Sequence, residues 1–230
     1  MKRTRAAGIS TPIRALIAAL LLSALPTLTR AEDASPEPSA AERLLFMNPH
    51  LAGLKAPSTL RYQFVRTDSA EGGGFNDKVE VQLARGKTVP CCKVSGSFLS
   101  GERAMRAPEV DDARSNPVLM YFLEYEVRQL QRATKGGAAH FRQRIRLSLV
   151  DEAELTPTRI TWAGREVDAT TVQVSPFLND PYRARFERDA RKRYSFVVSD
   201  AVPGGIYQIR SLLPTEAGTA AVEETLTLLP

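Results

Sequence analysis

Three groups of residues in this sequence have side chains and spacing that could support chemistry, and an adjacent cysteine pair is the first. Cys91 and Cys92 are the only two cysteines in the chain. Neighbouring Cα atoms lie about 3.8 Å apart, closer than disulfide geometry prefers, so a bond between these two would be strained and easily reduced. The pair is therefore a candidate redox site, and the alternatives are one buried and one exposed thiol, metal binding or intermolecular pairing.

The two histidines, His50 and His140, are considered as metal ligands, and His140 also as a general base. Neither has ligand-type spacing to the cysteines, and a closed zinc site needs four ligands, so no zinc site is predicted. A copper(I) site with a methionine stays an alternative. His140 could act as the general base of a Ser or Cys hydrolase, but the sequence has no Gly-x-Ser-x-Gly nucleophile elbow. No catalytic residue is assigned, no motif indicates a cofactor, and a structural role is favoured for His140.

A row of arginines is the third group. Arg142, Arg144 and Arg146 alternate with largely apolar residues, which predicts a strand over 141–149 with the three guanidinium groups on one face. One interpretation is a solvated face paired with carboxylates on the next strand. The other is an anion-binding surface for a phosphate, a carboxylate or a lipid headgroup. Residues 182–194, with six basic and two acidic side chains, are interpreted as a solvated connector.

One long helix is predicted over 117–134, directly before the arginine row. Asn116 or Ser115 would cap it, Pro117 suits its first turn, and two glycines follow its end. Its apolar residues recur at helical spacing, and Tyr121 and Tyr125 widen that stripe. The helix is expected to cover a sheet. The alternative is a lid over a ligand cavity, in which the two tyrosines would be ligand-binding residues.

Most of the remaining chain alternates between apolar and polar residues, which is typical of strands. Segments 60–66 and 79–85, with a glycine-rich turn at 71–75, predict a β-hairpin. Tight turns between short strands favour antiparallel pairing. A short amphipathic helix is expected at 40–47 and ends before Pro49. The further predicted strands are 87–99, 159–162, 166–174, 193–199, 205–213 and 222–228.

These elements predict an α+β, β-rich fold: a curved antiparallel sheet, or half-barrel, with one long covering helix. The pattern of short strands and one long helix resembles the periplasmic lipoprotein-carrier family, in which a helix plugs a half-open barrel. The resemblance is one of element order and transfers no site residue. The alternative is an immunoglobulin-like β-sandwich in the C-terminal half, which two alternating strands and the turn at 202–205 would also suit.

The N-terminus carries an export address. A basic start, the apolar run 15–25 and small residues near 29–31 predict a signal peptide over 1–31, followed by a flexible leader at 32–41 and a single domain at 42–230. Five of the 31 Lys and Arg, and none of the 26 Asp and Glu, lie in residues 1–31, so the mature chain has no formal net charge. Nucleic-acid binding is therefore not expected. The mature protein is predicted to be periplasmic or secreted and not transmembrane.

Three classes of function fit this sequence, because no catalytic constellation is recognisable. The first is a non-enzymatic binding or carrier protein for an apolar or amphiphilic ligand such as a lipid or lipoprotein, which predicts a dry apolar cavity. The second is an envelope assembly or accessory factor that contacts other envelope proteins, which predicts an exposed apolar patch. The third is a redox or hydrolytic enzyme using Cys91 and Cys92 or His140, which predicts a polar cleft with convergent titratable groups. No pattern indicates an oligomeric state.

Overall fold

The computed structural model describes residues 37–69, 72–86 and 92–230. Residues 37–230 belong to one compact unit. The predicted signal segment 1–31, the first half of the predicted leader and Cys91 lie outside the described residues. Within the described ranges, no helix is long and apolar enough to cross a membrane.

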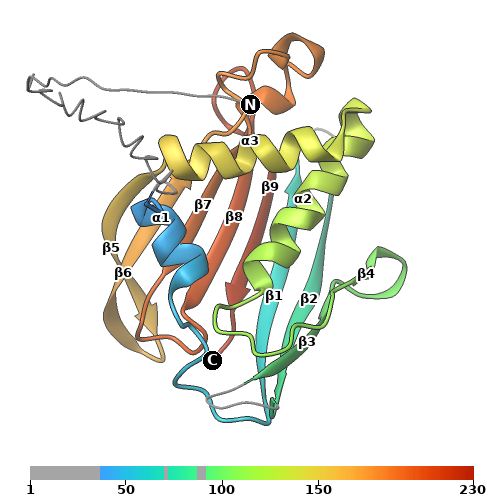
Figure 1. The fold of residues 1–230 in the computed structure, drawn as a ribbon. Coiled ribbons are helices and arrows are strands. Elements are labelled where there is room, and N and C mark those ends of the chain that lie inside the picture. The colour runs from blue at the N-terminus through green and yellow to red at the C-terminus, as the bar shows by residue number, and fades with distance from the viewer. Residues whose placement is uncertain (1–36, 70–71, 87–91) are drawn as a thin grey trace, which may run out of the picture. The chain divides into compact units, whose positions relative to one another are not determined.

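Nine strands in the described part of the chain form one antiparallel sheet, which Figure 1 shows behind the helices. The strands are β1 Ser58–Asp68, β2 Gly73–Ala84, β3 Lys93–Phe98, β4 Met105–Arg106, β5 Glu154–Trp162, β6 Arg165–Val174, β7 Arg193–Val198, β8 Ile206–Pro214 and β9 Ala220–Leu228. Their order across the sheet is β4-β3-β2-β1-β9-β8-β7-β6-β5. The last strand thus returns to the middle of the sheet, where Leu228 lies opposite Tyr62 of β1.

This topology decides between the two predicted architectures. An immunoglobulin-like sandwich would divide its strands between two packed sheets, whereas β6 to β9 continue the sheet that β1 and β2 begin. The sandwich alternative is therefore wrong, and a single open antiparallel sheet is confirmed. The predicted hairpin is also confirmed, since Tyr62 pairs with Val79. So is the turn at 202–205, where Gly204 and Gly205 have φ of 73° and 71°, which glycine adopts without strain.

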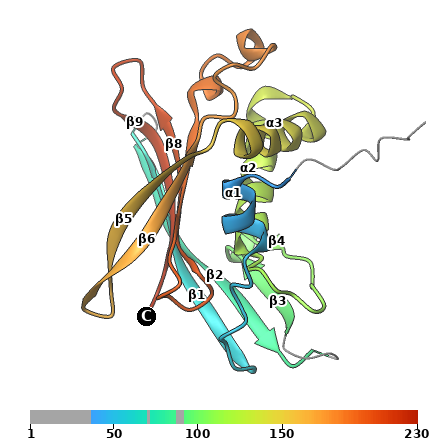
Figure 2. The same cartoon turned by 60° about the vertical axis from the view of Figure 1, so that its left-hand side comes forward.

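Helices cover one face of this sheet, as Figure 2 shows. The N-terminal segment comprises α1 Ala40–Glu42 and a π-helical turn, η1 Arg43–Met47, which together confirm the predicted short helix. Two longer helices, α2 Val118–Thr134 and α3 Ala138–Asp151, follow each other along the chain. The single-turn 3-10 helices are η2 Gly101–Arg103, η3 Arg183–Arg185 and η4 Asp189–Arg191. The prediction of one long covering helix is therefore wrong, because α3 is a second covering helix.

Helix α2 begins and ends close to where the sequence predicts. The side chain of Asn116 caps its start, since Asn116 Oδ1 accepts a hydrogen bond from the Val118 amide at 3.1 Å. At its end Lys135 takes the left-handed conformation, with φ of 58°, in place of one of the two glycines that follow it. The prediction of this helix over 117–134 is confirmed.

The predicted strand over 141–149 is wrong, because these residues form most of α3. The buried positions of α3 are Phe141, Ile145, Ser148 and Leu149, a helical spacing of three and four residues. Ile145 and Leu149 fit a period of two as well as a helical period, and Leu147 completed the apparent alternation. Leu147 is in fact exposed. Short segments can satisfy both periods, and here packing against α1 and α2 decides in favour of the helix.

The core lies between the sheet and these helices and is rich in aromatic rings. Phe64 of β1 and Phe98 of β3 have ring centroids 6.0 Å apart, and Phe98 lies 5.3 Å from Tyr125 of α2. Phe122 of α2 is also fully buried. Each such ring contributes roughly 1.5–3 kcal/mol when it is removed from water. This packing fixes α2 on the sheet and so determines which side chains remain on its other side.

Candidate ligand-binding site

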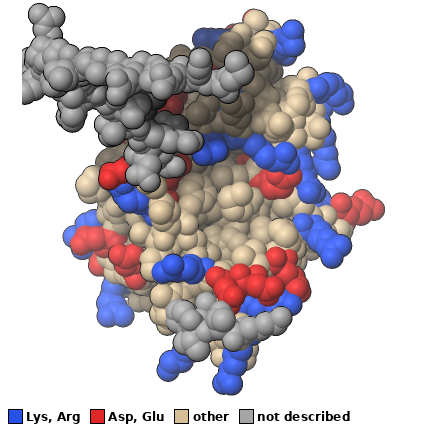
Figure 3. All heavy atoms as spheres, viewed as in Figure 1, with Lys and Arg blue, Asp and Glu red and all other residues tan. Residues whose placement is uncertain are grey.

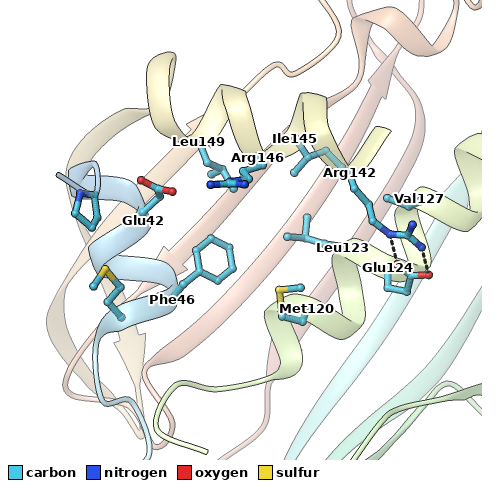
Figure 4. A pocket seen from close by; sticks show the side chains of 12 residues that line it. Glu42, Phe46, Met120, Leu123, Glu124, Val127, Arg142, Ile145, Arg146 and Leu149 are labelled. Carbon is cyan, nitrogen blue, oxygen red and sulfur yellow. Dashed lines mark hydrogen bonds and ion pairs between the residues drawn. The ribbon is translucent and has the colours of Figure 1, made fainter. Parts of the chain in front are cut away.

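A cavity of about 460 Å³ lies among α1, η1, α2 and α3. Figure 4 shows that its walls come from these helical elements, with the sheet behind them. In Figure 3 the central part of the helix-covered face is mostly free of charged side chains, and Lys, Arg, Asp and Glu lie mainly around it. The apolar wall consists of Phe46, Met47, Met120, Leu123, Val127, Ile145 and Leu149. A volume of this size lies within the range of sites for small molecules.

The spacing of residues along the two long helices explains why these side chains converge. On α2 the lining residues are Met120, Leu123, Glu124 and Val127, which stand at positions i, i+3, i+4 and i+7. The lining residues of α3 follow the same spacing: Arg142, Ile145, Arg146 and Leu149. Positions at this spacing share one face of a helix. Each helix therefore turns one complete face toward the cavity, and the two faces meet at an angle.

The inner wall of the cavity is buried and its mouth is open. Leu123, Val127, Ile145 and Leu149 are buried. Met120 keeps 57% of its surface exposed, although it also lines the cavity. A large exposed methionine beside a buried apolar wall is a surface that water covers poorly and that an apolar molecule can cover well.

Charged side chains stand at the rim. Arg142 donates two hydrogen bonds of 3.0 Å to Glu124, and this hydrogen bonding lowers the pKa of the Glu124 carboxyl. Glu42 is held by a capping box, in which it accepts a hydrogen bond of 2.9 Å from the Ser39 amide. Arg146 lies between Glu42 and Arg142 in Figure 4. In the part of the chain that the structure describes, no ion pair or hydrogen bond of the Arg146 side chain is found.

The predicted arginine row does not exist as one face. Residues two apart on a helix point in widely different directions, whereas residues four apart share a face. Arg142 and Arg146 accordingly line the cavity, and Arg144 points elsewhere, with its Nε 3.4 Å from the buried carboxylate of Asp180. The expectation of three guanidinium groups on one strand face is therefore wrong, because α3 is a helix. The cavity receives two of the three arginines.

The two predicted ligand-binding tyrosines face the sheet and do not line this cavity. Tyr121 donates a hydrogen bond of 3.0 Å to the carbonyl of Pro108, and Tyr125 donates one of 2.8 Å to Glu224 Oε1. Burial, and then the negative charge of Glu224, raise the pKa of the Tyr125 hydroxyl, so it stays a donor. Tyr125 also borders a second, polar cavity of about 280 Å³ between α2 and the β2–β4 edge.

Beneath α2 lies a buried ionic cluster that sequence analysis missed. Glu126 of α2 and Glu224 of β9 are fully buried, and Lys192 forms an ion pair with Glu126 and lies 3.9 Å from Glu224. Arg66 of β1 donates a hydrogen bond of 2.6 Å to Glu224. Ser211 of β8 lies 3.2 Å from Glu126 and 3.1 Å from Glu224. The cluster thus joins α2 to three strands and to the residue before β7.

The two carboxyl groups of this cluster titrate in opposite directions. Burial raises the pKa of Glu126 to about 8, despite the attraction of Lys192. Burial also opposes ionisation of Glu224, but the hydrogen bond from Glu126 and the charges of Lys192 and Arg66 outweigh it and lower the pKa of Glu224 to about 2. Near neutral pH the pair therefore holds one proton, and the negative charge that remains on Glu224 lies near both Lys192 and Arg66.

A signal for the cluster was present in the sequence. Glu126 stands four residues after Phe122 and four before Leu130, so an acidic residue occupies the apolar face of α2. Glu224 stands between Val222 and Leu226 on the apolar side of β9. An acidic residue at a core position implies a buried partner, although the sequence does not name Lys192 as that partner.

Each histidine makes polar contacts with residues distant in the sequence. His50 lies 2.9 Å from the carbonyl of Leu44 through Nε2 and accepts a hydrogen bond of 3.3 Å from the Asn116 amide at Nδ1, and burial lowers the pKa of this imidazole. His140 Nε2 lies 2.8 Å from Asp180 Oδ2. None of the hydrogen bonds among the described residues joins His140 to a hydroxyl or thiol group, so no nucleophile–base pair is formed there.

The cysteine pair is described only in part. Cys92 is fully buried in the core and is disulfide-bonded. Cys91, the other cysteine of the chain, lies outside the described residues. Over the described ranges, no group of three or more His, Cys, Asp and Glu side chains is placed to hold a metal ion.

Comparison with known proteins gives little further information. No family model and no curated protein matches the sequence. Among solved structures, the lipoprotein LppX of Mycobacterium tuberculosis is similar to this chain, with 8% sequence identity over 76% of this chain and 86% of that chain and a TM-score of 0.34. A TM-score of this size carries no argument about ligand or mechanism.

Proposed function

We propose that this protein binds the apolar part of an amphiphilic ligand in the cavity among α1, η1, α2 and α3, and that it does so as a non-enzymatic binding or carrier protein in the periplasm or outside the cell. The observation that carries the proposal is an apolar wall with an open, charged rim. An apolar chain in this cavity would remove both its own surface and that of Met120 from water, at about 25 cal/mol per Å².

The size of the cavity favours one alkyl chain over two. The volume of about 460 Å³ lies toward the lower end of the range for small-molecule sites, about 300–1,000 Å³, which suits a single alkyl chain. Each buried methylene contributes about 0.8 kcal/mol. Burial of part of one alkyl chain would therefore offset the translational and rotational entropy that the ligand loses on binding.

The rim favours a ligand whose polar end is anionic. Arg142 is occupied by Glu124, and Arg144 lies beside Asp180. Arg146 lines the same cavity and has no such partner among the described residues. A guanidinium group binds carboxylate or phosphate through paired hydrogen bonds. Arg146 is therefore the residue that we assign to the headgroup of the ligand.

The half-barrel interpretation of the sheet belongs to this proposal. In it, the helix-covered face of the sheet is the concave side, and the ligand enters through the helical layer. Entry between α2 and the sheet is disfavoured, because the ionic cluster around Glu126 and Glu224 joins them. The movable elements would then be α1 and η1, which the hydrogen bond from Ser39 Oγ to the carbonyl of Leu149 links to the end of α3.

Two exposed apolar residues, Met120 on α2 and Leu147 on α3, provide a matched test. Met120→Glu places a charge at the mouth of the cavity, and Leu147→Glu places the same charge on an exposed position of α3 that does not line it. With a fluorescent fatty acid as probe, we expect Met120→Glu to weaken binding at least tenfold and Leu147→Glu to leave it unchanged. Absence of binding to the unaltered protein, or equal loss in both variants, would refute the proposal.

A further inference from the structure

The segment that connects β6 to β7 is an ordered platform and not a simple loop. Figures 1 and 2 show it beyond the end of the sheet, next to α3. Phe177 and Phe186 are buried there, and their rings lie 5.7 Å and 5.8 Å from that of Phe141 on α3, edge to face. Such aromatic pairs add specific packing energy to the burial of their surfaces. The platform is thus anchored on α3 by its own apolar residues.

Asp180 fixes the platform from below. Its side chain is fully buried, and its two carboxylate oxygens receive the Tyr182 amide at 2.7 Å and His140 Nε2 at 2.8 Å. Arg144 Nε lies 3.4 Å from the same carboxylate. The 3-10 helix η3 begins at Arg183, directly after the Tyr182 amide that Asp180 binds. The backbone that follows Asp180 is therefore held in place by these side-chain contacts as well as by its covalent connections.

The outer side of this platform combines apolar and cationic side chains. Leu178 keeps 45% and Tyr182 54% of its surface exposed. Arg183, Arg185 and Arg188 are exposed, and none of the three forms an ion pair with another residue of the described ranges. The guanidinium group of Arg185 lies over the ring of Tyr182, with its carbon 5.3 Å from the ring centroid.

Negative charge nearby is too small to neutralise these arginines. Glu187 is the one fully exposed acidic residue between Leu178 and Lys192, and Asp189 is half-buried. Asp180 is already engaged by His140 and Arg144. An interpretation as a solvated connector explains the charges but leaves the exposed Leu178 and Tyr182, at the same projecting segment, without a role.

We propose that this platform docks the protein on an anionic membrane surface. Arginine and tyrosine both place an apolar body in the interface of a bilayer while a polar end stays hydrated. A basic cluster near an anionic surface strengthens binding about fivefold per arginine. Leu178 and Tyr182 at the same site add apolar contact with the bilayer interface to the attraction between the arginines and the anionic headgroups. The association is weak and reversible, because only two apolar side chains enter the interface.

This inference does not depend on the cavity, because the platform and the cavity share no lining residue. It does give α3 two functions. The face of α3 with Ile145 lines the cavity, and Phe141 and Arg144 support the platform. A ligand taken from a membrane would thus be bound close to the surface on which the protein docks.

Co-sedimentation with vesicles tests the proposal. The probes are vesicles of equal parts phosphatidylglycerol and phosphatidylcholine, with pure phosphatidylcholine vesicles as the neutral comparison. We expect the full mature protein to bind the anionic vesicles at low salt, to bind the neutral vesicles weakly, and to dissociate at high salt. The triple change R183Q, R185Q and R188Q should weaken anionic binding at least about tenfold.

A control of equal charge separates a platform from general electrostatics. Arg85, Arg106 and Arg165 are exposed and lie on other parts of the molecule. Their triple change to Gln should leave binding within about twofold, because only charges within about a Debye length of the surface contribute. Changing Leu178 and Tyr182 to Ser should weaken the binding that persists at intermediate salt.

Three results would overturn the proposal. The first is equal loss in both arginine triples, which would make the effect one of net charge alone. The second is no change when Leu178 and Tyr182 are replaced. The third is absence of vesicle binding by the unaltered protein, which would leave the platform to an acidic protein partner. Fatty-acid binding by the same variants, measured in parallel, reports on the cavity separately.

Discussion

The two sides of helix α2 differ in how completely they are filled. Toward the sheet, Tyr125 and Glu126 are buried and every charge in the ionic cluster has a partner. Toward the cavity, Met120 and Leu123 line an open apolar wall. The first side has satisfied polar groups and close aromatic packing, which stabilise one arrangement. The second side leaves apolar surface that only a further molecule can cover. One helix therefore carries a structural face and a candidate binding face.

This difference separates the roles of the two groups of charges as well. Buried charges stabilise a fold only when they are paired, and removing one partner is costly. Exposed rim charges such as Arg146 cost little to change. Changes beneath α2 should therefore alter the stability of the protein, and changes above it should alter binding at nearly constant stability.

The largest expected effect follows the removal of Lys192. Lys192→Met removes the cation that contacts both Glu126 and Glu224 inside the core. We expect a loss of about 3 kcal/mol in the free energy of unfolding, the lower end for a broken buried pair, because Glu126 can retain a proton. Urea denaturation followed by circular dichroism measures this loss.

The double change Glu126→Gln with Lys192→Met is its control. It removes both members of the pair, and Glu224 keeps Arg66 as a partner. Part of the stability should return relative to Lys192→Met alone. If Lys192→Met unfolded no more easily than the unaltered protein, the cluster would not anchor α2 as described.

A pH dependence is the next effect in size. Glu126 has its pKa raised from 4.5 to about 8 in the folded protein. Above about pH 4.5 the unfolded chain loses this proton while the folded protein keeps it, so the stability from Glu126 is complete below that pH and is lost as the pH rises toward 8. Glu224, with its pKa lowered from 4.5 to about 2, contributes fully above about pH 4.5 and loses this contribution as the pH falls from there toward 2.

Denaturation at a series of pH values between 5 and 9 checks this expectation. The free energy of unfolding of the unaltered protein should fall across that interval. In Glu126→Gln, which cannot ionise, the fall should be much smaller. Parallel curves for the two proteins would show that Glu126 ionises normally and that the cluster has a different charge state.

The fold was predictable from the sequence as far as local patterns determine it. Strand alternation located β1, β2 and β6 to β9, and caps located α2. The sequence did not show that β9 pairs with β1, because that pairing joins segments about 160 residues apart. The segment 141–149 was misassigned for the opposite reason. Its local pattern fits two periods, and only tertiary packing separates them.

The sequence indicated some of the residues that line the candidate site, but it did not indicate where in the fold the site lies. Arg142 and Arg146 line the cavity, but the rest of the lining depends on a second face of α2 that the sequence merges with the core stripe. Leu123 and Val127 belong to the cavity wall, whereas Phe122 belongs to the core. Neighbouring residues on one helix separate into two faces only when the partners on each side are known.

The smallest effect concerns the rim, where Arg146→Gln removes one cation from the cavity side. We expect the affinity for oleate to fall between threefold and tenfold, about 0.7–1.4 kcal/mol, which is the range of one charge-assisted contact at a partly hydrated site. The affinity for oleyl alcohol, which has the same chain and no charge, should not change. Fluorescence displacement with both ligands measures the two affinities in one assay.

Arg144→Gln is the matched control, because Arg144 lies on the same helix outside the cavity and beside Asp180. Equal losses for oleate and oleyl alcohol would assign Arg146 a role in shaping the cavity. Equal losses in the two arginine variants would remove the headgroup assignment and leave the apolar wall as the basis of binding.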